Sequence, residues 1–150
     1  EGVDKAVDEF DVRRPEILGI SVLTSFKGDE YVNTLEGVLQ GRDVSEDMIK
    51  NQVLNLAGLS KESGIDGLVC SSREVEYVKN EYPELTTMVP GIKGPKSGIA
   101  GSTQNMDRVA TPSNAINWGS DYLVIGSAIH KAKDPAQAMK EIIDDITSVM

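Results

Sequence analysis

The chain has little cysteine, histidine and positive charge. Its single cysteine, Cys70, excludes a disulfide within the chain. With one histidine, His130, no cluster of His, Cys and carboxylate residues has the spacing of metal ligands, so the sequence predicts no metal site. The 15 Lys and Arg residues are outnumbered by 24 Asp and Glu residues, which gives a formal net charge of -9. Because nonspecific binding to nucleic acid needs surplus basic charge, no nucleic-acid partner is expected.

Long hydrophobic runs are also lacking, and no apolar stretch is long enough to span a bilayer. We therefore expect a cytoplasmic protein without a membrane partner. The composition, 39% hydrophobic and 26% charged, is typical of a folded protein, and residues 1–150 are expected to form one domain. The chain starts at Glu1, and the following residues are typical of the end of a helix rather than a signal sequence, so we expect it to begin within a fold.

Four short apolar runs are the main structural signal. They cover Ile17–Leu23, Asp66–Cys70, Thr86–Pro90 and Asp121–Gly126, and each is followed by a polar or glycine-rich turn and then a helical pattern. Runs that are apolar throughout predict a parallel sheet covered on both faces. The fold class is therefore an α/β protein built from parallel β/α repeats, with functional loops at the carboxyl ends of the strands.

Local signals predict where several helices begin and end. Pro15 ends the first helical segment at Arg14, because the residue before proline disfavours helix. A second helix begins with Ser45 as its N-cap and ends at Gly64. Three further helices are expected: one opened by a capping box of Ser71 and Glu74, one between Pro112 and Gly119, and one capped by Asp134. The buried face of the last helix is predicted to contain Ala138, Met139, Ile142, Ile143, Ile146 and Val149.

A long glycine-rich segment between Gly91 and Thr111 has no periodic pattern and is expected to be functional or disordered. Its backbone N–H groups, together with Lys93, Lys96 and the turn after Gly126, could surround a phosphate dianion. The alternative is that the glycines only allow a surface loop to turn and that the lysines are ordinary solvated charges.

Several motifs, in this order and spacing, resemble the orotidine 5'-phosphate decarboxylase family along most of the chain. They are Leu23–Ser25, Lys61–Ser72, Val89–Lys93, Asp107–Pro112 and Gly119–Gly126. The resemblance implies a TIM (β/α)8 barrel, of which this chain would be the C-terminal half, strands five to eight, preceded by the end of the fourth helix.

The resemblance also implies an activity, the decarboxylation of orotidine monophosphate (OMP) to UMP in pyrimidine biosynthesis, without a cofactor. The lysine and aspartates that carry the reaction belong to an Asp-x-Lys-x-x-Asp motif in the family's first half, and this sequence does not contain it. No catalytic residue is therefore predicted here, and the chain is expected to be an inactive carboxy-lyase without an N-terminal half. The second half of the family supplies substrate binding, which helps to lower the reaction barrier.

The first substrate-binding positions carried over from the family follow two of the strands. Thr24 matches a position near the pyrimidine, and Ser25 beside it is a second candidate. Pro90 and Gly91 begin the Pro-Gly-Ile motif, and Lys93 stands where many members have arginine. Lysine keeps the charge but loses the bidentate fork of arginine.

The remaining positions concern the phosphate. Gln104 matches the family's loop glutamine only after a two-residue shift. Gly126 matches the phosphate-binding glycine, but Ser127 replaces the phosphate-binding arginine. Serine cannot replace a charge-assisted bidentate contact, so either a basic group such as Lys96 or Lys131 compensates or phosphate affinity is weak.

Three single residues have mainly structural interpretations. Cys70 is interpreted as core packing rather than as a nucleophile, and Trp118 as packing its short helix onto the sheet. His130 follows the turn of the fourth strand and remains a minor candidate for ligand contact.

Half a barrel has two open strand edges, so we expect association with a complementary N-terminal half or with a second copy of the chain. Two other functions remain open. The chain could be a non-catalytic phosphate-binding or assembly module, which Ser127 and the absent lysine motif favour. It could also belong to a related phosphosugar barrel family, but that requires acid–base residues that the sequence does not reveal.

Overall fold

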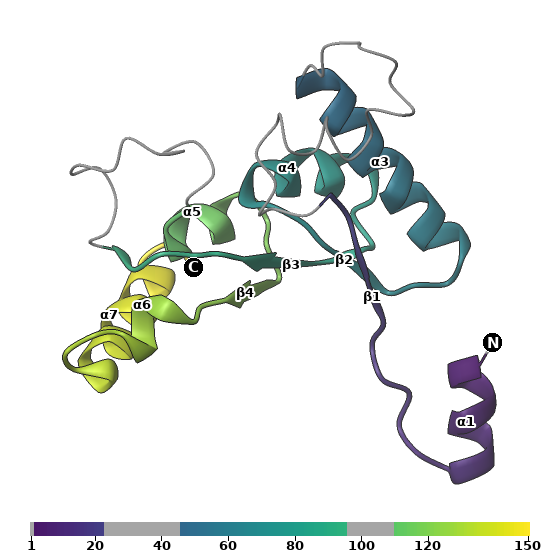
Figure 1. The fold of residues 1–150 in the computed structure, drawn as a ribbon, viewed down its shortest axis with the longest axis horizontal. Coiled ribbons are helices and arrows are strands. Elements are labelled where there is room, and N and C mark those ends of the chain that lie inside the picture. Colours follow the sequence, from purple (N-terminus) through teal and green to yellow (C-terminus); the bar gives the residue numbers. More distant parts are fainter. Residues whose placement is uncertain (1, 23–45, 96–109) are drawn as a thin grey trace.

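The computed structural model describes residues 2–22, 46–95 and 110–150. After the first helix, each strand in the described parts is followed along the chain by a helix, and the last strand is followed by two (Figure 1). The helices are α1 (Gly2–Phe10), α3 (Glu46–Glu62), α4 (Ser72–Glu81), α5 (Pro112–Asn117), α6 (Ser127–His130) and α7 (Pro135–Thr147). The strands are β1 (Leu18–Ile20), β2 (Gly67–Val69), β3 (Thr86–Pro90) and β4 (Tyr122–Val124).

The four strands form one parallel sheet in the order β1-β2-β3-β4. Neighbours in the sheet are therefore neighbours in sequence, as expected for successive β/α units that all cross over in the same direction. The prediction of a parallel α/β repeat, and of the four strand positions, is confirmed. Among the described residues, no helix combines the length and apolar character needed to cross a membrane.

One face of the sheet is packed against α3 and α4. Leu68 and Val89 on the strands, and Val53 and Val75 on the helices, are completely buried. Thr87 pairs with Leu68 in the register and is also fully buried on this face. This layer of helix on sheet is the hydrophobic core of the described chain.

The opposite face of the sheet is open at both edges. The register aligns Ile20, Val69, Met88 and Tyr122 in one row, and side chains of one row point to the same side. Ile20 is 62% exposed and Tyr122 is 48% exposed. The expectation of a sheet covered on both faces is therefore wrong for the described part of the chain, because the helices that follow the strands cover only one side.

Most helix boundaries agree with the sequence signals. The N–H of Ser71 donates to Glu74 Oε2 at 2.8 Å, as a capping box requires, and Asp134 Oδ1 accepts the N–H of Gln137 at 3.0 Å. Gly64 and Gly119 lie after α3 and α5 with φ of 70° and 94°, a conformation that favours glycine. The predicted cap Ser45 lies outside the described residues.

Two predictions about helices are wrong in part. α1 ends at Phe10 rather than at Arg14. Asp11 adopts a φ of 49°, which is not helical, so the helix has already ended before the chain reaches Pro15. On α7 only Ile142 is buried, whereas Met139 and Ile143 are about half exposed. Because α7 packs mainly against the short helices α5 and α6, it has too small a surface to bury its whole apolar face. Val149, also in the predicted stripe, is 37% exposed.

An aspartate before β2 holds the amino end of β1. Asp66 Oδ2 accepts the N–H of Ile17 at 2.8 Å, and Arg14 Nη1 donates to Asp66 Oδ1 at 2.7 Å. The hydrogen bond from Ile17 and then that from Arg14 lower the pKa of Asp66 below its usual range. Asp121 before β4 has the same role for β3, so one carboxylate joins the amino ends of β1 and β2 and another joins those of β3 and β4.

Cys70 is completely buried, which confirms its interpretation as core packing. Burial raises the pKa of its thiol to about 12. Because the thiolate is the reactive form, we predict that a thiol reagent at pH 8 modifies the folded chain at least about 100-fold more slowly than the urea-unfolded chain. Rapid labelling of the folded chain would contradict this prediction.

The same raised pKa of Cys70 makes the stability of the folded chain depend on pH. The thiol is protonated in both states below about pH 9, so its contribution to stability is fully present there. As the pH rises from about 9 towards 12, the unfolded chain ionises first and that contribution is lost.

Candidate functional site

The carboxyl ends of β3 and β4 lie side by side. Pro90 pairs with Val124 in the register, so the turn that follows β3 and the turn that follows β4 leave the same edge of the sheet (Figure 1). Gly91 begins the first turn with a φ of 78°, and among the described residues no atom beyond its two chain neighbours lies within 4 Å of the position that a Cβ would take. The backbone is therefore accessible at this point, as a close approach by a ligand would require.

Lys93 lies on the same turn. The side chain of Lys93 is exposed, while its neighbour Ile92 is buried and anchors the turn to the core. The N–H of Lys93 donates to the carbonyl of Ala110 at 3.2 Å, which joins the two described ends of the glycine-rich segment. The base of that segment is thus fixed beside β3.

The turn after β4 leads directly into α6. The carbonyl of Gly126 accepts the N–H of Ile129 at 2.9 Å and the N–H of His130 at 3.1 Å. The Nδ1 atom of His130 lies 4.0 Å from the position of a Cβ on Gly126. Ser127 and Lys131, at the two ends of α6, are both exposed.

Five of the eight predicted substrate-binding residues are therefore brought to one edge of the sheet by β3 and β4. They are Pro90, Gly91, Lys93, Gly126 and Ser127. Thr24, Ser25 and Gln104, and the additional candidate Lys96, lie outside the described residues. Whether these residues bind substrate stays a prediction.

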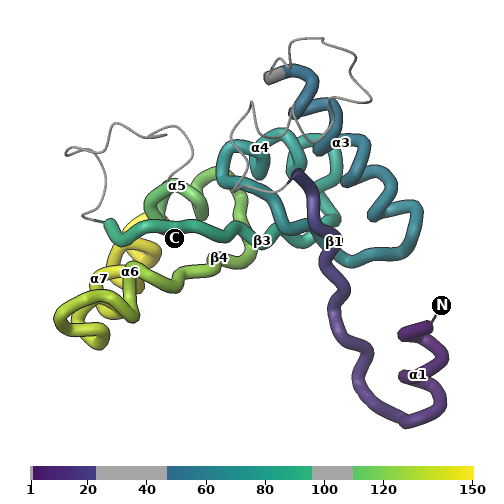
Figure 2. The backbone as a smooth tube through the Cα atoms, in the orientation of Figure 1, coloured from purple at the N-terminus to yellow at the C-terminus, as the bar shows by residue number. Residues whose placement is uncertain are grey.

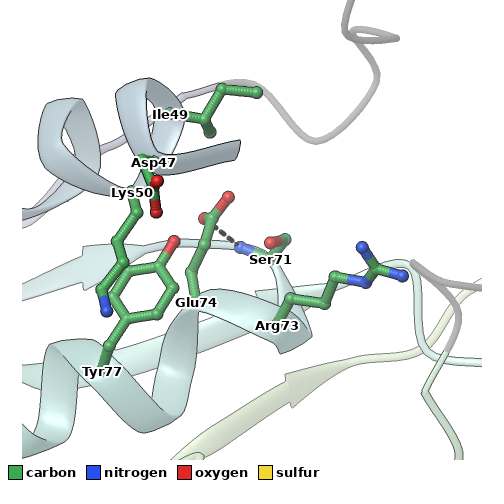
Figure 3. Close-up of a pocket in the computed structure, with 7 residues that line it drawn as sticks. All are labelled: Asp47, Ile49, Lys50, Ser71, Arg73, Glu74 and Tyr77. Carbon is green, nitrogen blue, oxygen red and sulfur yellow. Dashed lines mark hydrogen bonds between the residues drawn. The ribbon is translucent and has the colours of Figure 1, made fainter. Parts of the chain in front are cut away.

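A pocket of about 250 Å³ opens at the carboxyl end of β2, between the first turns of α3 and α4 (Figure 3). Its floor contains Glu74, which is buried and accepts the N–H of Ser71. Lys50 Nζ lies 5.4 Å from the centre of the Tyr77 ring, within the range of a cation–π interaction. The complete lining is Asp47, Ile49, Lys50, Ser71, Arg73, Glu74 and Tyr77.

Sequence reasoning did not identify this pocket. Arg73 is exposed and extends away from Glu74 and Tyr77 (Figure 3). The available signal was its position, because Arg73 lies two residues after the capping serine Ser71, just beyond the end of a strand, where functional residues of a β/α fold concentrate. The basic groups on the carboxyl-end side of the described sheet thus include Arg73 as well as Lys93 and Lys131.

No arrangement of three or more His, Cys, Asp or Glu side chains suitable for a metal ion occurs in residues 2–22, 46–95 and 110–150. At the carboxyl ends of β3 and β4, the described residues offer exposed lysines, accessible backbone and a serine hydroxyl. These groups can donate hydrogen bonds to an anion.

Comparisons with known proteins match nearly the whole chain. The profile of the "Orotidine 5'-phosphate decarboxylase / HUMPS family" matches residues 1–142. The orotidine 5'-phosphate decarboxylase of Pseudomonas paraeruginosa is 38% identical over 143 residues, which cover 95% of this chain and 56% of that protein. That of Pseudomonas fluorescens is 40% identical over 134 residues, covering 89% of this chain and 52% of that protein.

Solved structures agree with these relatives. The crystal structure of orotidine 5'-phosphate decarboxylase from Lactobacillus acidophilus superposes with a TM-score of 0.64 at 30% identity, covering 89% of this chain and 50% of that one. An uncharacterized conserved protein from Geobacillus kaustophilus gives a TM-score of 0.62 at 26% identity, with the same coverage of this chain. The chain spans about half the length of the relatives and solved structures named here.

Proposed function

Because the chain belongs to the orotidine 5'-phosphate decarboxylase / HUMPS family, we propose that it supplies the phosphate- and pyrimidine-binding half of an orotidine 5'-phosphate decarboxylase. In this proposal β1 to β4 correspond to strands five to eight of the family's (β/α)8 barrel. The observation that carries the proposal is the pairing of Pro90 with Val124, which puts the Pro-Gly-Ile turn beside the turn of Gly126 and Ser127. Two motifs that are separated in the sequence thus meet at one edge.

The proposed division of work follows from the residues present. OMP loses CO2 from its pyrimidine ring, and the carbon that loses it must be protonated. The family's lysine and aspartates for that step belong to a motif that this sequence does not contain. We propose that a complementary N-terminal half supplies them, while this chain binds the phosphate and ring. Binding energy from the phosphate then contributes to catalysis at the distant ring carbon.

Ser127 is the main departure from the family pattern, and it leads to a prediction. Replacing Ser127 by arginine should tighten UMP binding about tenfold, because a bidentate, charge-assisted contact is roughly twice as strong as a neutral hydrogen bond. Ser148→Arg adds the same charge at the far end of α7 and should leave affinity unchanged. Isothermal titration with UMP measures both variants. Equal affinities for the two would contradict the placement of phosphate beside Ser127.

The activity itself is tested by complementation. The chain is titrated with UMP alone and in the presence of the N-terminal half of the Pseudomonas fluorescens relative, and OMP decarboxylation is followed in both conditions. We expect turnover only in the mixture. Binding of UMP without turnover in the mixture would favour the alternative, a non-catalytic phosphate-binding module, which the serine at position 127 and the absent lysine motif support.

A further inference from the structure

The segment after β4 is basic although the chain as a whole is strongly acidic. Residues 126–133 contain two lysines and one histidine but no Asp or Glu, whereas the whole chain has a formal net charge of -9. The three basic side chains, His130, Lys131 and Lys133, are all exposed. Figures 1 and 2 show α6 directly after β4, where it contacts α7. A local surplus of basic groups favours an anion at this place.

The ring of His130 lies beside the turn that precedes α6. Side chains of a helix lean towards its amino end, so a residue is carried back towards the one four positions earlier. Accordingly, the Nδ1 atom of His130 lies 4.0 Å from the position that a Cβ on Gly126 would take. In the described part of the chain, no other side chain beyond the two neighbours of Gly126 comes this close to that position. His130 therefore lies at one side of the turn.

This ring is available to a ligand. His130 is exposed, and within the described ranges its ring makes no hydrogen bond or ion pair with another residue. A neutral imidazole has one N–H donor, and a protonated imidazole has two. In either form the ring can donate a hydrogen bond to a phosphate oxygen.

The turn needs such a donor because Ser127 stands where the family has a phosphate-binding arginine. A serine hydroxyl donates one hydrogen bond and carries no charge. Of the two lysines considered as substitutes, Lys96 lies outside the described residues. Lys131 ends α6, where its N–H donates to the carbonyl of Ser127 at 3.2 Å, and its side chain does not reach within 4 Å of the Cβ position on Gly126. The contact with the turn comes from His130.

We propose that His130 takes the place of the arginine and donates a hydrogen bond to the phosphate of a bound nucleoside monophosphate. This inference rests on the proposed function, which puts the phosphate beside Gly126 and Ser127. It deepens that proposal by naming the side chain that compensates for Ser127. A dianion seated on this turn meets the ring at its side, and the basic segment around it stabilises the negative charge.

Titration of the full chain with UMP and with uridine, which lacks the phosphate, tests the contact. His130→Ala should weaken UMP binding about tenfold and leave the affinity for uridine unchanged. Because His130 is exposed, the unfolding curve should also be unchanged. Lys133→Ala removes another exposed charge of the same segment and should change the UMP affinity by less than about twofold.

Three results would overturn the proposal. The first is an unchanged UMP affinity in His130→Ala. The second is an equal loss of affinity for UMP and uridine, because the phosphate would then not be involved. The third is a larger loss of UMP affinity in Lys131→Ala than in His130→Ala, which would make Lys131 the substitute for the arginine.

A double variant tests whether His130 stands in for the arginine. In the Ser127→Arg background, His130→Ala should weaken UMP binding by less than about twofold, because the arginine then makes the contact with the phosphate. An equal loss in both backgrounds would show that the two side chains do not replace each other and would overturn the proposal. If the unaltered chain binds no UMP, alone or with the N-terminal half of the Pseudomonas fluorescens relative, the proposed function fails as well. UMP binding that does not depend on His130 contradicts only the present inference, so the two failures are distinguishable.

Discussion

Replacing Gly67 by alanine is expected to lower the free energy of unfolding by about 3 kcal/mol. Gly67 lies in β2, between Leu18 on β1 and Thr86 on β3. A Cβ at this position would lie 2.7 Å from Leu18 Cδ2 and 2.8 Å from Thr86 Cβ, and would also collide with the carbonyl oxygen of Thr86. Because that oxygen belongs to the backbone of the sheet, the clash can be relieved only by moving a strand.

Gly64→Ala is the matched control for this prediction. Gly64 has a φ of 70°, but in the described part of the chain no atom beyond its two chain neighbours lies within 4 Å of the position that a Cβ would take. Alanine there should cost only about 1 kcal/mol, from backbone strain without a collision. Urea unfolding followed by circular dichroism measures both variants. A smaller loss for Gly67→Ala than for Gly64→Ala would show that β2 is less tightly enclosed than the structure indicates.

Replacing Asp121 by alanine should have the second largest effect, a loss of about 2 kcal/mol. Asp121 Oδ2 accepts the N–H of Thr87 at 2.7 Å, its hydroxyl at 3.0 Å and Lys79 Nζ at 2.6 Å. Thr87 is fully buried, so the variant would leave its backbone donor without this partner inside the sheet. Asp144→Ala, on the exposed face of α7, is the control and should change stability by less than about 0.5 kcal/mol.

The pH dependence gives this second prediction a separate readout. Partial burial acts to raise the pKa of Asp121, but the hydrogen bonds from Lys79 and Thr87 outweigh it, so the net pKa is lowered. Because this pKa is lowered, the contribution of Asp121 to the free energy of unfolding is present above the pKa of the unfolded chain, near pH 4. It is lost as the pH falls through the pKa of the folded chain. In the Asp121→Ala variant, the free energy of unfolding should therefore depend less steeply on pH in the acid range. An unchanged pH dependence in the acid range would show that this carboxylate is not a source of the acid sensitivity.

The strands and most helix ends could be predicted because their causes are local. A continuous apolar run specifies a strand in a parallel sheet, and the positive φ after α3 and α5 is satisfied by Gly64 and Gly119. The Ser71 and Glu74 capping box also depends only on residues three apart. In contrast, the early end of α1 depends on Asp11 adopting a positive φ, which non-glycine residues rarely do.

The candidate site was predictable to the extent that it follows from motifs. The sequence alone names Gly91, Lys93, Gly126 and Ser127, while the register of β3 with β4 places their turns at one edge. The pocket containing Lys50, Arg73 and Tyr77 was not predictable, because its residues come from two helices and no motif joins them. Contacts between distant residues depend on how elements pack, and this information is absent from local patterns.

By itself, the sequence determined the α/β class, the positions of the strands and the family, because each depends on local patterns or on motifs in order. Only the tertiary structure decided which apolar residues are covered. Ile20, Tyr122 and Ile143 have the same apolar character as the core residues Leu68 and Val89, but remain exposed because no described element packs over them. The hydrophobic effect rewards burial against any suitable surface, so an apolar residue indicates a need for cover and not which element, or which partner, provides it.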